Sequence, residues 1–508
     1  MANRNDSATS GGAVYDRSFI SGPVPPRKKR IIICCDGTWQ SAVSLDPKQG
    51  SPSNVARISR VLARAGLDRH GDEWQQLVYY DAGVGTGNIG WYEKNRQGSL
   101  GKGLLENVIE AYNFIVNNYN QGDELFFFGF SRGAYTVRST AGLVCTLGVI
   151  RPSSMRKFLK LYNSYTSAFE SADKAPQQQF HEWGPWTEYV KDNADCYASK
   201  EVPVKVIGVF DTVGSLGVPD LGHVYRKDNS AIRKAYQFHD VELNDRIEHA
   251  YHALALDEQR SPFSPSVWKC KSGAKTQLCQ VWFPGAHINI GGGSDQNADE
   301  DNQTGDREQL ASISYAWMLD RVRPWLAVDE NMLEAQKKDI IKAANYKPPP
   351  PPAKGWFRSG VDAVTVSNNM GIISDSHGLL YDVQGFPQPR TPGAYHDQNE
   401  YTVERIHPSV YFRQQFTKSH NMPTYVPIAM KDWERVYEKN GKGKDLKPRQ
   451  GWMWKKFRVE NGEKKVERAL WEFEVGHMPQ DKSMEKFLVD ISWSKAFSAE
   501  VQNGWKSS

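Results

Sequence analysis

The feature that most restricts the fold of this chain is an alternation of short apolar runs with amphipathic stretches of helical period, which begins at residue 30. The apolar runs have the length of strands and lie at 30–35, 77–80, 124–128, 204–210, 252–256 and 278–283. The amphipathic stretches predict helices over 54–66, 104–119, 132–147 and 308–328. Strands that alternate with helices form a mostly parallel sheet with helices on both faces. We therefore predict an α/β fold.

Composition divides the chain into three parts. Residues 1–28 contain no extended apolar run and are predicted to be disordered, whereas the alternating pattern predicts a globular unit over 29–330. A charged helix is then expected to lead into five consecutive prolines at 348–352, for which the composition predicts extended polyproline in a loop or linker. Farther on, Asn461-Gly462 separates two alternating segments and predicts a β-hairpin. We predict a smaller α+β cap over 331–508, and an independent domain on a proline linker is the alternative.

Charge and hydropathy exclude several classes of protein. The chain carries 63 Lys+Arg and 59 Asp+Glu among 508 residues, and a net charge of +4 gives no reason to expect a nucleic-acid partner. No stretch approaches 18 apolar residues, and the first 30 residues lack the apolar centre of a signal peptide. We therefore expect a cytoplasmic protein without a transmembrane segment.

No motif indicates a metal or a nucleotide. The six cysteines include the adjacent Cys34 and Cys35 inside an apolar run, where cysteine behaves as a small buried hydrophobe. Neither CxxC nor a His-rich metal spacing occurs. The glycine-rich stretch 83–87 lacks the GK[ST] of a phosphate-binding loop. We expect no cofactor and no metal.

The sharpest chemical signal is Gly129-Phe130-Ser131-Arg132-Gly133, a GxSxG motif directly after the strand ELFFF and directly before a helical pattern. A nucleophile elbow requires this context. Glycine on either side of the serine lets the backbone turn sharply, so that the Oγ atom projects above the sheet. A chance GxSxG is the alternative, but the strand, turn and helix favour Ser131 as a catalytic serine.

A catalytic serine needs a base and a carboxylate, which follow it in the order Ser, Asp or Glu, His in α/β-hydrolases. Asp211 ends the strand 204–210 and is our candidate for the carboxylate, with Asp257 as its rival. His287 follows the strand 278–283 and is our candidate for the base, with His407 as the alternative beyond the prolines.

An oxyanion hole needs backbone amides near the serine. The amide of Arg132 begins the helix, and the loop Asp36-Gly37-Thr38 after the first strand can supply a second amide from Gly37. We expect Asp36 and Thr38 to support this loop, with Asp36 accepting hydrogen bonds from loop amides or orienting Arg132. The alternative is that Asp36 only caps a turn.

Five ordered motifs make the chain resemble the DUF2235 family of α/β-hydrolases, which includes the Tle1-type phospholipase effectors of bacterial type VI secretion and many fungal proteins. The motifs are Cys35-Asp36-Gly37-Thr38-Trp39, Gly129-Phe130-Ser131-Arg132-Gly133-Ala134, Phe210-Asp211-Thr212-Val213-Gly214, Ala255-Leu256-Asp257-Glu258 and Val281-Trp282-Phe283-Pro284-Gly285-Ala286-His287. The resemblance covers about residues 29–325 and implies an α/β-hydrolase-like fold and a Ser131, Asp211 and His287 triad. Where the family usually has an aspartate, this chain has Asn289.

Two classes of function fit these residues. The first is a serine hydrolase that cleaves a carboxylic ester through an acyl-enzyme, and the resemblance implies a lipid or phospholipid ester with peripheral membrane contact. An esterase or thioesterase acting on a small acyl metabolite shares this mechanism. The second class is a non-catalytic interaction protein that retains the fold, a hypothesis motivated by Asn289 and by the unassigned region after residue 330.

Overall fold

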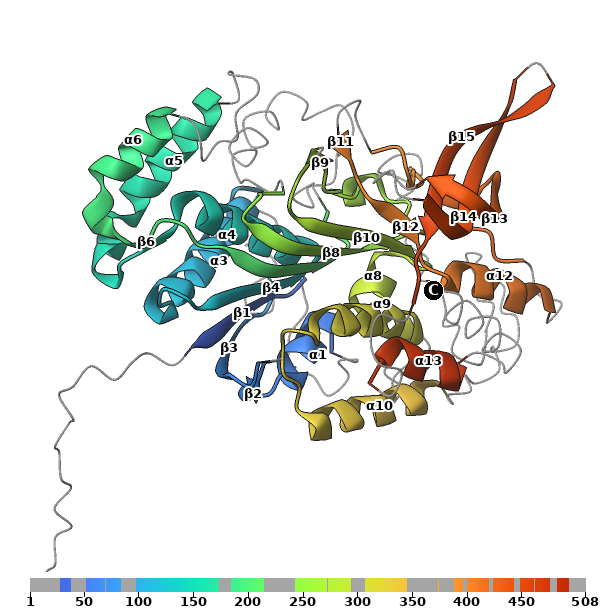
Figure 1. Cartoon of the computed structure of the whole chain (residues 1–508), viewed down its shortest axis with the longest axis horizontal. Coiled ribbons are helices and arrows are strands. Elements are labelled where there is room, and N and C mark those ends of the chain that lie inside the picture. Colours follow the sequence, from blue (N-terminus) through green and yellow to red (C-terminus); the bar gives the residue numbers. More distant parts are fainter. Residues whose placement is uncertain are drawn as a thin grey trace, which may run out of the picture.

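The computed structural model of the chain describes residues 28–37, 52–68, 70–83, 97–172, 184–213, 243–271, 273–293, 307–344, 373, 388–395, 400–419, 424–442, 448–460, 462–475 and 482–492. Within these residues, an 11-stranded sheet forms the centre of the molecule (Figure 1). Its strands, in spatial order, are β2 (Ala65–Leu67), β3 (Glu73–Asp81), β1 (Lys29–Cys35), β4 (Glu124–Phe130), β7 (Val204–Phe210), β8 (Ile247–Ala255), β10 (Gln277–Phe283), β12 (Glu404–Ile406), β15 (Glu463–Glu472), β14 (Pro448–Glu460) and β13 (Trp433–Lys442).

The sheet is mostly parallel. Neighbouring strands from β3 to β15 run parallel to one another, whereas β2 at one edge and β14 and β13 at the other are antiparallel to their neighbours. Each apolar run predicted as a strand lies in this sheet. Shorter described strands form two small pairs, β5 (Val149–Ile150) with β6 (Tyr197–Ser199) and β9 (Cys270–Lys271) with β11 (Glu400–Tyr401).

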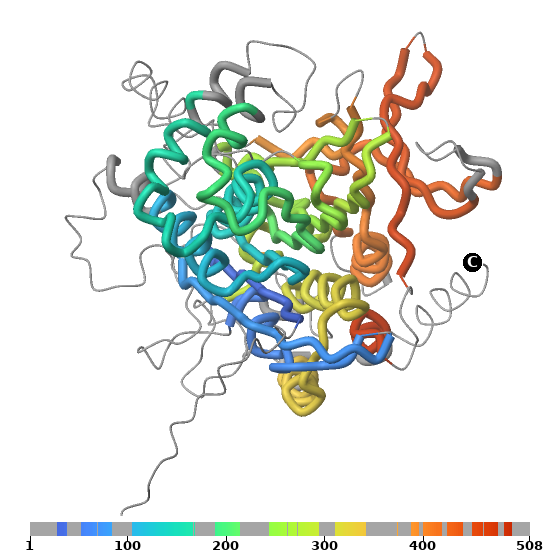
Figure 2. The backbone as a smooth tube through the Cα atoms, turned by 60° about the vertical axis from the view of Figure 1, so that its left-hand side comes forward, coloured from blue at the N-terminus to red at the C-terminus, as the bar shows by residue number. Residues whose placement is uncertain are grey.

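Helices cover both faces of the sheet. Ile31 and Ile33 of β1 join one apolar cluster while Ile32 and Cys34 join another, so both faces of this strand are buried. Helices α3 (Gln97–Asn118), α4 (Ser131–Leu147) and α5 (Phe158–Ala172) contribute to the first cluster, and α1 (Asn54–Val61), α9 (Arg307–Val322), α10 (Glu330–Ala344) and α13 (Met484–Ser492) to the second. Figure 2 shows α9, α10 and α13 close together on one side of the sheet. The predicted α/β fold is confirmed.

Two predicted helices end earlier than expected. The helix predicted over 54–66 ends at Val61, and Gly66 instead pairs with β3 in strand β2, where a side chain would collide with Ala327. The helix predicted over 308–328 ends at Val322, because Pro324 has no backbone N–H and disfavours helical geometry in the preceding residue. Among the described helices, none has the length and apolar character needed to cross a membrane.

The region after residue 330 continues the same sheet. Strand β12 pairs with β10, and β15 pairs with β12, so main-chain hydrogen bonds join this region to the parallel strands. Strands β14 and β15 form the predicted hairpin, with Glu460 opposite Glu463. The region also contains helix α12 (Ser409–Ser419). Helix α6 (Gly184–Asp192) lies earlier in the chain, after α5. The prolines at 348–352 and residues 1–27 lie outside the described residues, and the boundaries at 28 and 330 stay predictions.

A third apolar cluster joins the two regions through side chains. Leu254 of β8 and Trp282 of β10 are fully buried, and they pack in this cluster with Ile406 of β12. Trp433, Trp454 and Leu470, from β13, β14 and β15, also belong to it. The region after residue 330 therefore shares its core with the parallel sheet.

We expect a chain that ends near residue 330 to be insoluble or inactive. Its loss of β12 would leave β10 as an unpaired edge and uncover Trp282, and an exposed apolar edge strand promotes aggregation. The soluble fraction and the turnover of a small ester would be compared with those of a chain that ends at residue 492, which keeps every described element. Soluble protein with full turnover would support an independent domain instead.

Candidate active site

Ser131 lies at a sharp turn between β4 and α4. Its φ of 55° is in the left-handed region, which is unusual for a residue other than glycine. The flanking glycines allow this turn: a Cβ atom on Gly129 would lie 2.6 Å from the carbonyl oxygen of Gly133, and one on Gly133 would lie 2.1 Å from that of Cys35. This is the strained strand-to-helix geometry of a nucleophile elbow.

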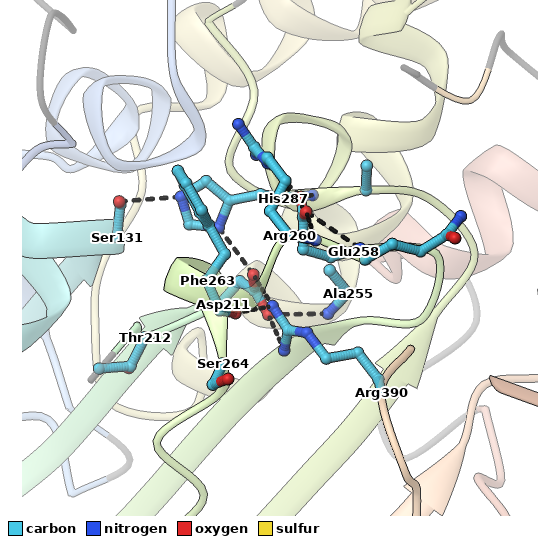
Figure 3. Close-up of polar contacts among 12 residues, drawn as sticks. Ser131, Asp211, Thr212, Ala255, Glu258, Arg260, Phe263, Ser264, His287 and Arg390 are labelled. Atoms are coloured by element: carbon cyan, nitrogen blue, oxygen red, sulfur yellow. Dashed lines mark hydrogen bonds and ion pairs between the residues drawn. The ribbon is translucent and has the colours of Figure 1, made fainter. Parts of the chain in front are cut away.

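His287 and Asp211 stand in line with Ser131 (Figure 3). The Nε2 atom of His287 lies 2.8 Å from Ser131 Oγ, and its Nδ1 atom lies 2.7 Å from Asp211 Oδ2. Asp211 directly follows β7, and His287 begins the short helix α8 (His287–Gly291) after β10. Because β4, β7 and β10 are parallel, their carboxyl ends bring the three residues to one edge of the sheet.

Two aromatic rings fix the imidazole of His287. The ring of Phe130 has its centroid 4.8 Å from that of His287, and the ring of Phe263 meets the imidazole edge-on at 4.9 Å. Gly291 packs so closely against Phe130 that a Cβ atom there would lie 2.2 Å from the ring. The side chain of His287 is therefore held in the orientation that reaches both Ser131 and Asp211.

The carboxylate of Asp211 is fully buried and has partners on both oxygens. Its Oδ1 atom accepts a hydrogen bond from the amide of Ala255 at 2.9 Å. Arg390, from the region after residue 330, pairs with Asp211 Oδ2 at 3.0 Å. Burial alone would raise the pKa of Asp211, but the positive charge of Arg390 and the hydrogen bonds from His287 and Ala255 outweigh it, so this pKa lies well below its ordinary value.

A family model described as "T6SS, Phospholipase effector Tle1-like, catalytic domain" matches residues 29–321. The chain belongs to this Tle1-like family. The match ends close to the last residue of α9, so the residues from β12 onward lie beyond it.

The Tle1-like chain is also similar to several individual proteins. "Uncharacterized protein YEL023C" of Saccharomyces cerevisiae is 25% identical over 266 residues, which are 50% of this chain and 34% of that protein. The solved structure of the Tle1 effector bound to the VgrG spike from the type 6 secretion system is 18% identical, with a TM-score of 0.32 over 57% of this chain and 56% of that chain. An uncharacterized protein from Pseudomonas aeruginosa is 16% identical, with a TM-score of 0.33 over 63% and 52%. This chain therefore spans about a third of the yeast relative.

The loop after β1 in this Tle1-like domain approaches Ser131. A Cβ atom on Gly37 would lie 3.4 Å from Ser131 Cβ, so the backbone of Gly37 lies against Ser131. Its amide, however, donates a hydrogen bond to Asp36 Oδ1 at 2.8 Å. Gly37 could serve as an oxyanion donor only if this bond opened. The amide of Arg132 lies in the first turn of α4, where amides have no partner within the helix, and Thr38 lies outside the described residues.

Asp36 ties this loop to its surroundings. Besides the amide of Gly37, its carboxylate accepts hydrogen bonds from Ser53, which caps α1, and from Tyr80 of β3 at 2.7 Å. Burial raises the pKa of Asp36. These partners join the loop after β1 to α1 and β3, and the bond from Gly37 comes from a loop amide.

The two rival residues lie elsewhere. Asp257 Oδ2 accepts hydrogen bonds from the amide of Gly285 at 2.6 Å and from the hydroxyl of Tyr425 at 2.7 Å. His407 stacks on Phe283, with ring centroids 4.5 Å apart, and its Nε2 lies 3.3 Å from Glu485 Oε1. Both side chains attach the region after residue 330 to the sheet, and none of these contacts involves Ser131.

Two further residues hold the start of α8. The Oδ1 atom of Asn289 accepts a hydrogen bond from the amide of Ala286 at 3.0 Å, which caps the helix. The fully buried Glu258 accepts one from the amide of His287 at 3.2 Å and pairs with Arg260 at 2.8 Å. Asn289 thus has a structural role next to His287. Within the described residues, no group of His, Cys, Asp and Glu side chains is arranged to hold a metal ion.

We expect Asp211→Asn to lower kcat by about four orders of magnitude, because an amide cannot balance the charge of a protonated His287 and favours the wrong tautomer. The matched control is Asp257→Asn, whose amide oxygen can still accept from Gly285. We expect this control to retain kcat within a few-fold. Circular dichroism establishes that the two variants are folded. Their turnover of one ester, compared with that of the wild type, checks the prediction. Equal losses would argue against Asp211 as the partner of the base.

Proposed function

We propose that the protein is a serine hydrolase that cleaves a carboxylic ester through an acyl-enzyme on Ser131. The observation that carries the proposal is the line from Ser131 Oγ to His287 Nε2 at 2.8 Å and from His287 Nδ1 to Asp211 Oδ2 at 2.7 Å. A nucleophile, a base and an orienting carboxylate in this arrangement support acyl transfer. Membership of a family named for phospholipase effectors supports a hydrolase that acts on a lipid or phospholipid ester.

In the proposed acylation, Ser131 Oγ bonds to the ester carbonyl carbon while His287 Nε2 accepts the hydroxyl proton. The carboxylate of Asp211 keeps the Nδ1–H of His287 in place and balances the positive charge that forms on the ring. As the tetrahedral intermediate collapses, the bond to the alcohol oxygen breaks and His287 returns the proton to that oxygen. Water then attacks the acyl-enzyme by the same two steps and releases the acid.

The negative charge on the carbonyl oxygen needs donors in this scheme. We assign one to the amide of Arg132, since the first turn of α4 carries free amides and a partial positive charge. The second donor belongs to the loop that follows β1, whose Gly37 lies against Ser131. A lipid substrate also implies that the protein contacts a membrane or micelle surface during turnover.

Two assays on the full chain test the proposal. The first measures hydrolysis of p-nitrophenyl esters of graded chain length and of phospholipid vesicles, and the second measures labelling by a fluorophosphonate. We expect labelling together with turnover that rises with acyl length if lipids are the substrates. Preference for short acyl chains would favour a small acyl metabolite. Absence of both labelling and turnover would favour the non-catalytic hypothesis.

A further inference from the structure

Arg390 reaches the site from far along the chain. It belongs to the segment 388–395, and its side chain is only 2% exposed. Its Nη2 atom lies 3.0 Å from Asp211 Oδ2 and its Nη1 atom lies 3.3 Å from Asp211 Oδ1. Contact of two guanidinium nitrogens with both carboxylate oxygens fixes the plane of the carboxylate as well as its position.

The guanidinium is itself held in place. Arg390 Nη2 also donates to the carbonyl oxygen of Phe263 at 2.6 Å, and Phe263 is the residue whose ring meets the edge of His287. The backbone of the segment is anchored on both sides, because the amide of Gln388 donates to Gln259 at 2.8 Å and that of Gly393 donates to Glu404 at 2.8 Å. Arg390 therefore connects the carboxylate to the same segment that packs on the imidazole.

The charge of Arg390 matters because Asp211 has no access to water. A fully buried carboxylate is costly to ionise without a cation, and Arg390 contributes more than any other group to lowering the pKa of Asp211 against the effect of burial. Other charged or titratable groups around Asp211 and His287 come from α4, β8 and the loop after β8, namely Arg138, His252, Glu258 and Arg260. Among the described contacts of Asp211, Arg390 is the one with a permanent positive charge.

We infer that Arg390 is a positioning residue, which holds the Asp211 carboxylate in the plane and charge state that serve His287. The inference rests on the proposed serine hydrolase function and extends the site to a residue beyond the family match, which ends at residue 321. The region after residue 330 thus completes the site.

The test compares Arg390→Met with Arg390→Lys in the full chain. Methionine keeps most of the length and removes the charge and the donors, whereas lysine keeps the charge but cannot bridge both oxygens. Hydrolysis of p-nitrophenyl butyrate would be followed from pH 5 to pH 9, with active enzyme counted by fluorophosphonate labelling. For Arg390→Met we expect kcat to fall by about 10- to 100-fold, with little change in KM. Losses of this size are typical when a residue that orients a metal ligand through a hydrogen bond is removed.

The pH profile distinguishes positioning from a merely structural role. Loss of a cation beside Asp211 leaves a more negative potential at the imidazole and favours its protonated form, which cannot act as base. The acid limb of kcat/KM for Arg390→Met should therefore move to higher pH. For Arg390→Lys the acid limb should stay near that of the wild type, while kcat falls by about tenfold.

Arg435→Met is the matched control. Arg435 forms a bidentate pair with Glu472, both distances being 2.7 Å, and its side chain is 8% exposed. Its loss should lower the Tm, but kcat and the acid limb should match the wild type because the pair joins β13 to β15, away from Asp211.

The outcomes separate the two proposals. A wild type that neither labels nor hydrolyses esters would overturn the serine hydrolase proposal and the inference with it. An active wild type whose Arg390→Met variant keeps its kcat and its acid limb would overturn the inference alone. If Arg390→Met does not fold, Arg390→Lys decides: lower kcat at an unchanged Tm supports the inference, and wild-type kcat contradicts it.

Discussion

Replacement of Ser131 by alanine should lower kcat by about six orders of magnitude, the loss found when a serine hydrolase loses its nucleophile. The Oγ atom of Ser131 is the atom that contacts His287, and alanine preserves the rest of the side chain. We therefore expect the fold to survive. The effect is measured by hydrolysis of p-nitrophenyl butyrate and by labelling with a fluorophosphonate. Circular dichroism checks that the variant is folded.

The same helix offers a matched control for this change. Ser139 of α4 is also buried, and its Oγ atom has no hydrogen-bond partner among the described residues. Because alanine removes an unsatisfied polar atom there, Ser139→Ala should keep both labelling and turnover. If Ser131→Ala were labelled as strongly as the wild type, the nucleophile would lie elsewhere.

Replacement of His287 by alanine should cost nearly as much activity as the loss of Ser131, since a serine without its base remains a weak nucleophile. The double variant Ser131→Ala/His287→Ala should be no less active than either single variant, because residues that act as a unit do not have additive effects. Turnover of the three variants on one ester, at equal concentrations of folded protein, measures the coupling.

His407→Ala is the control for this second change. His407 is buried and stacked on Phe283, so its loss should lower the free energy of unfolding by about 1 to 3 kcal/mol. The folded variant should keep its kcat, as none of the described contacts of His407 is with Ser131 or Asp211. An inactive His407→Ala beside an active His287→Ala would assign the base to the region after residue 330.

The turn at Ser131 could be predicted from sequence because its cause is local. The two glycines, the preceding apolar strand and the following helical pattern all lie within about thirty residues and independently favour one geometry. The parallel strands were predictable for the same reason, as their runs are apolar on both faces. The ends of the helices predicted over 54–66 and 308–328 were not predictable, because Pro324 and the close contact of Gly66 with Ala327 stop helices whose apolar period continues.

Arg390 could not be predicted in this way. It lies between Pro389 and Thr391 in a stretch without strand or helix period, and its partner Asp211 is 179 residues away. The role of the Gly37 amide was hidden for a similar reason, since a sequence pattern does not show that the side chain of Asp36 accepts its hydrogen bond. Likewise, the alternating pattern predicted β14 and β15 but gave no indication that β15 pairs with β12.

The position of β12 between β10 and β15 has a consequence for synthesis. Ser131, Asp211 and His287 leave the ribosome well before Arg390 and residues 404–406, so a nascent chain holds the residues of the proposed triad without the guanidinium that pairs with Asp211. Pairing of strands far apart in sequence is slow, and β10 stays a bare edge throughout this interval. We therefore expect the growing polypeptide to be prone to aggregation until β12 has been made, and its proposed site to be complete only after that point.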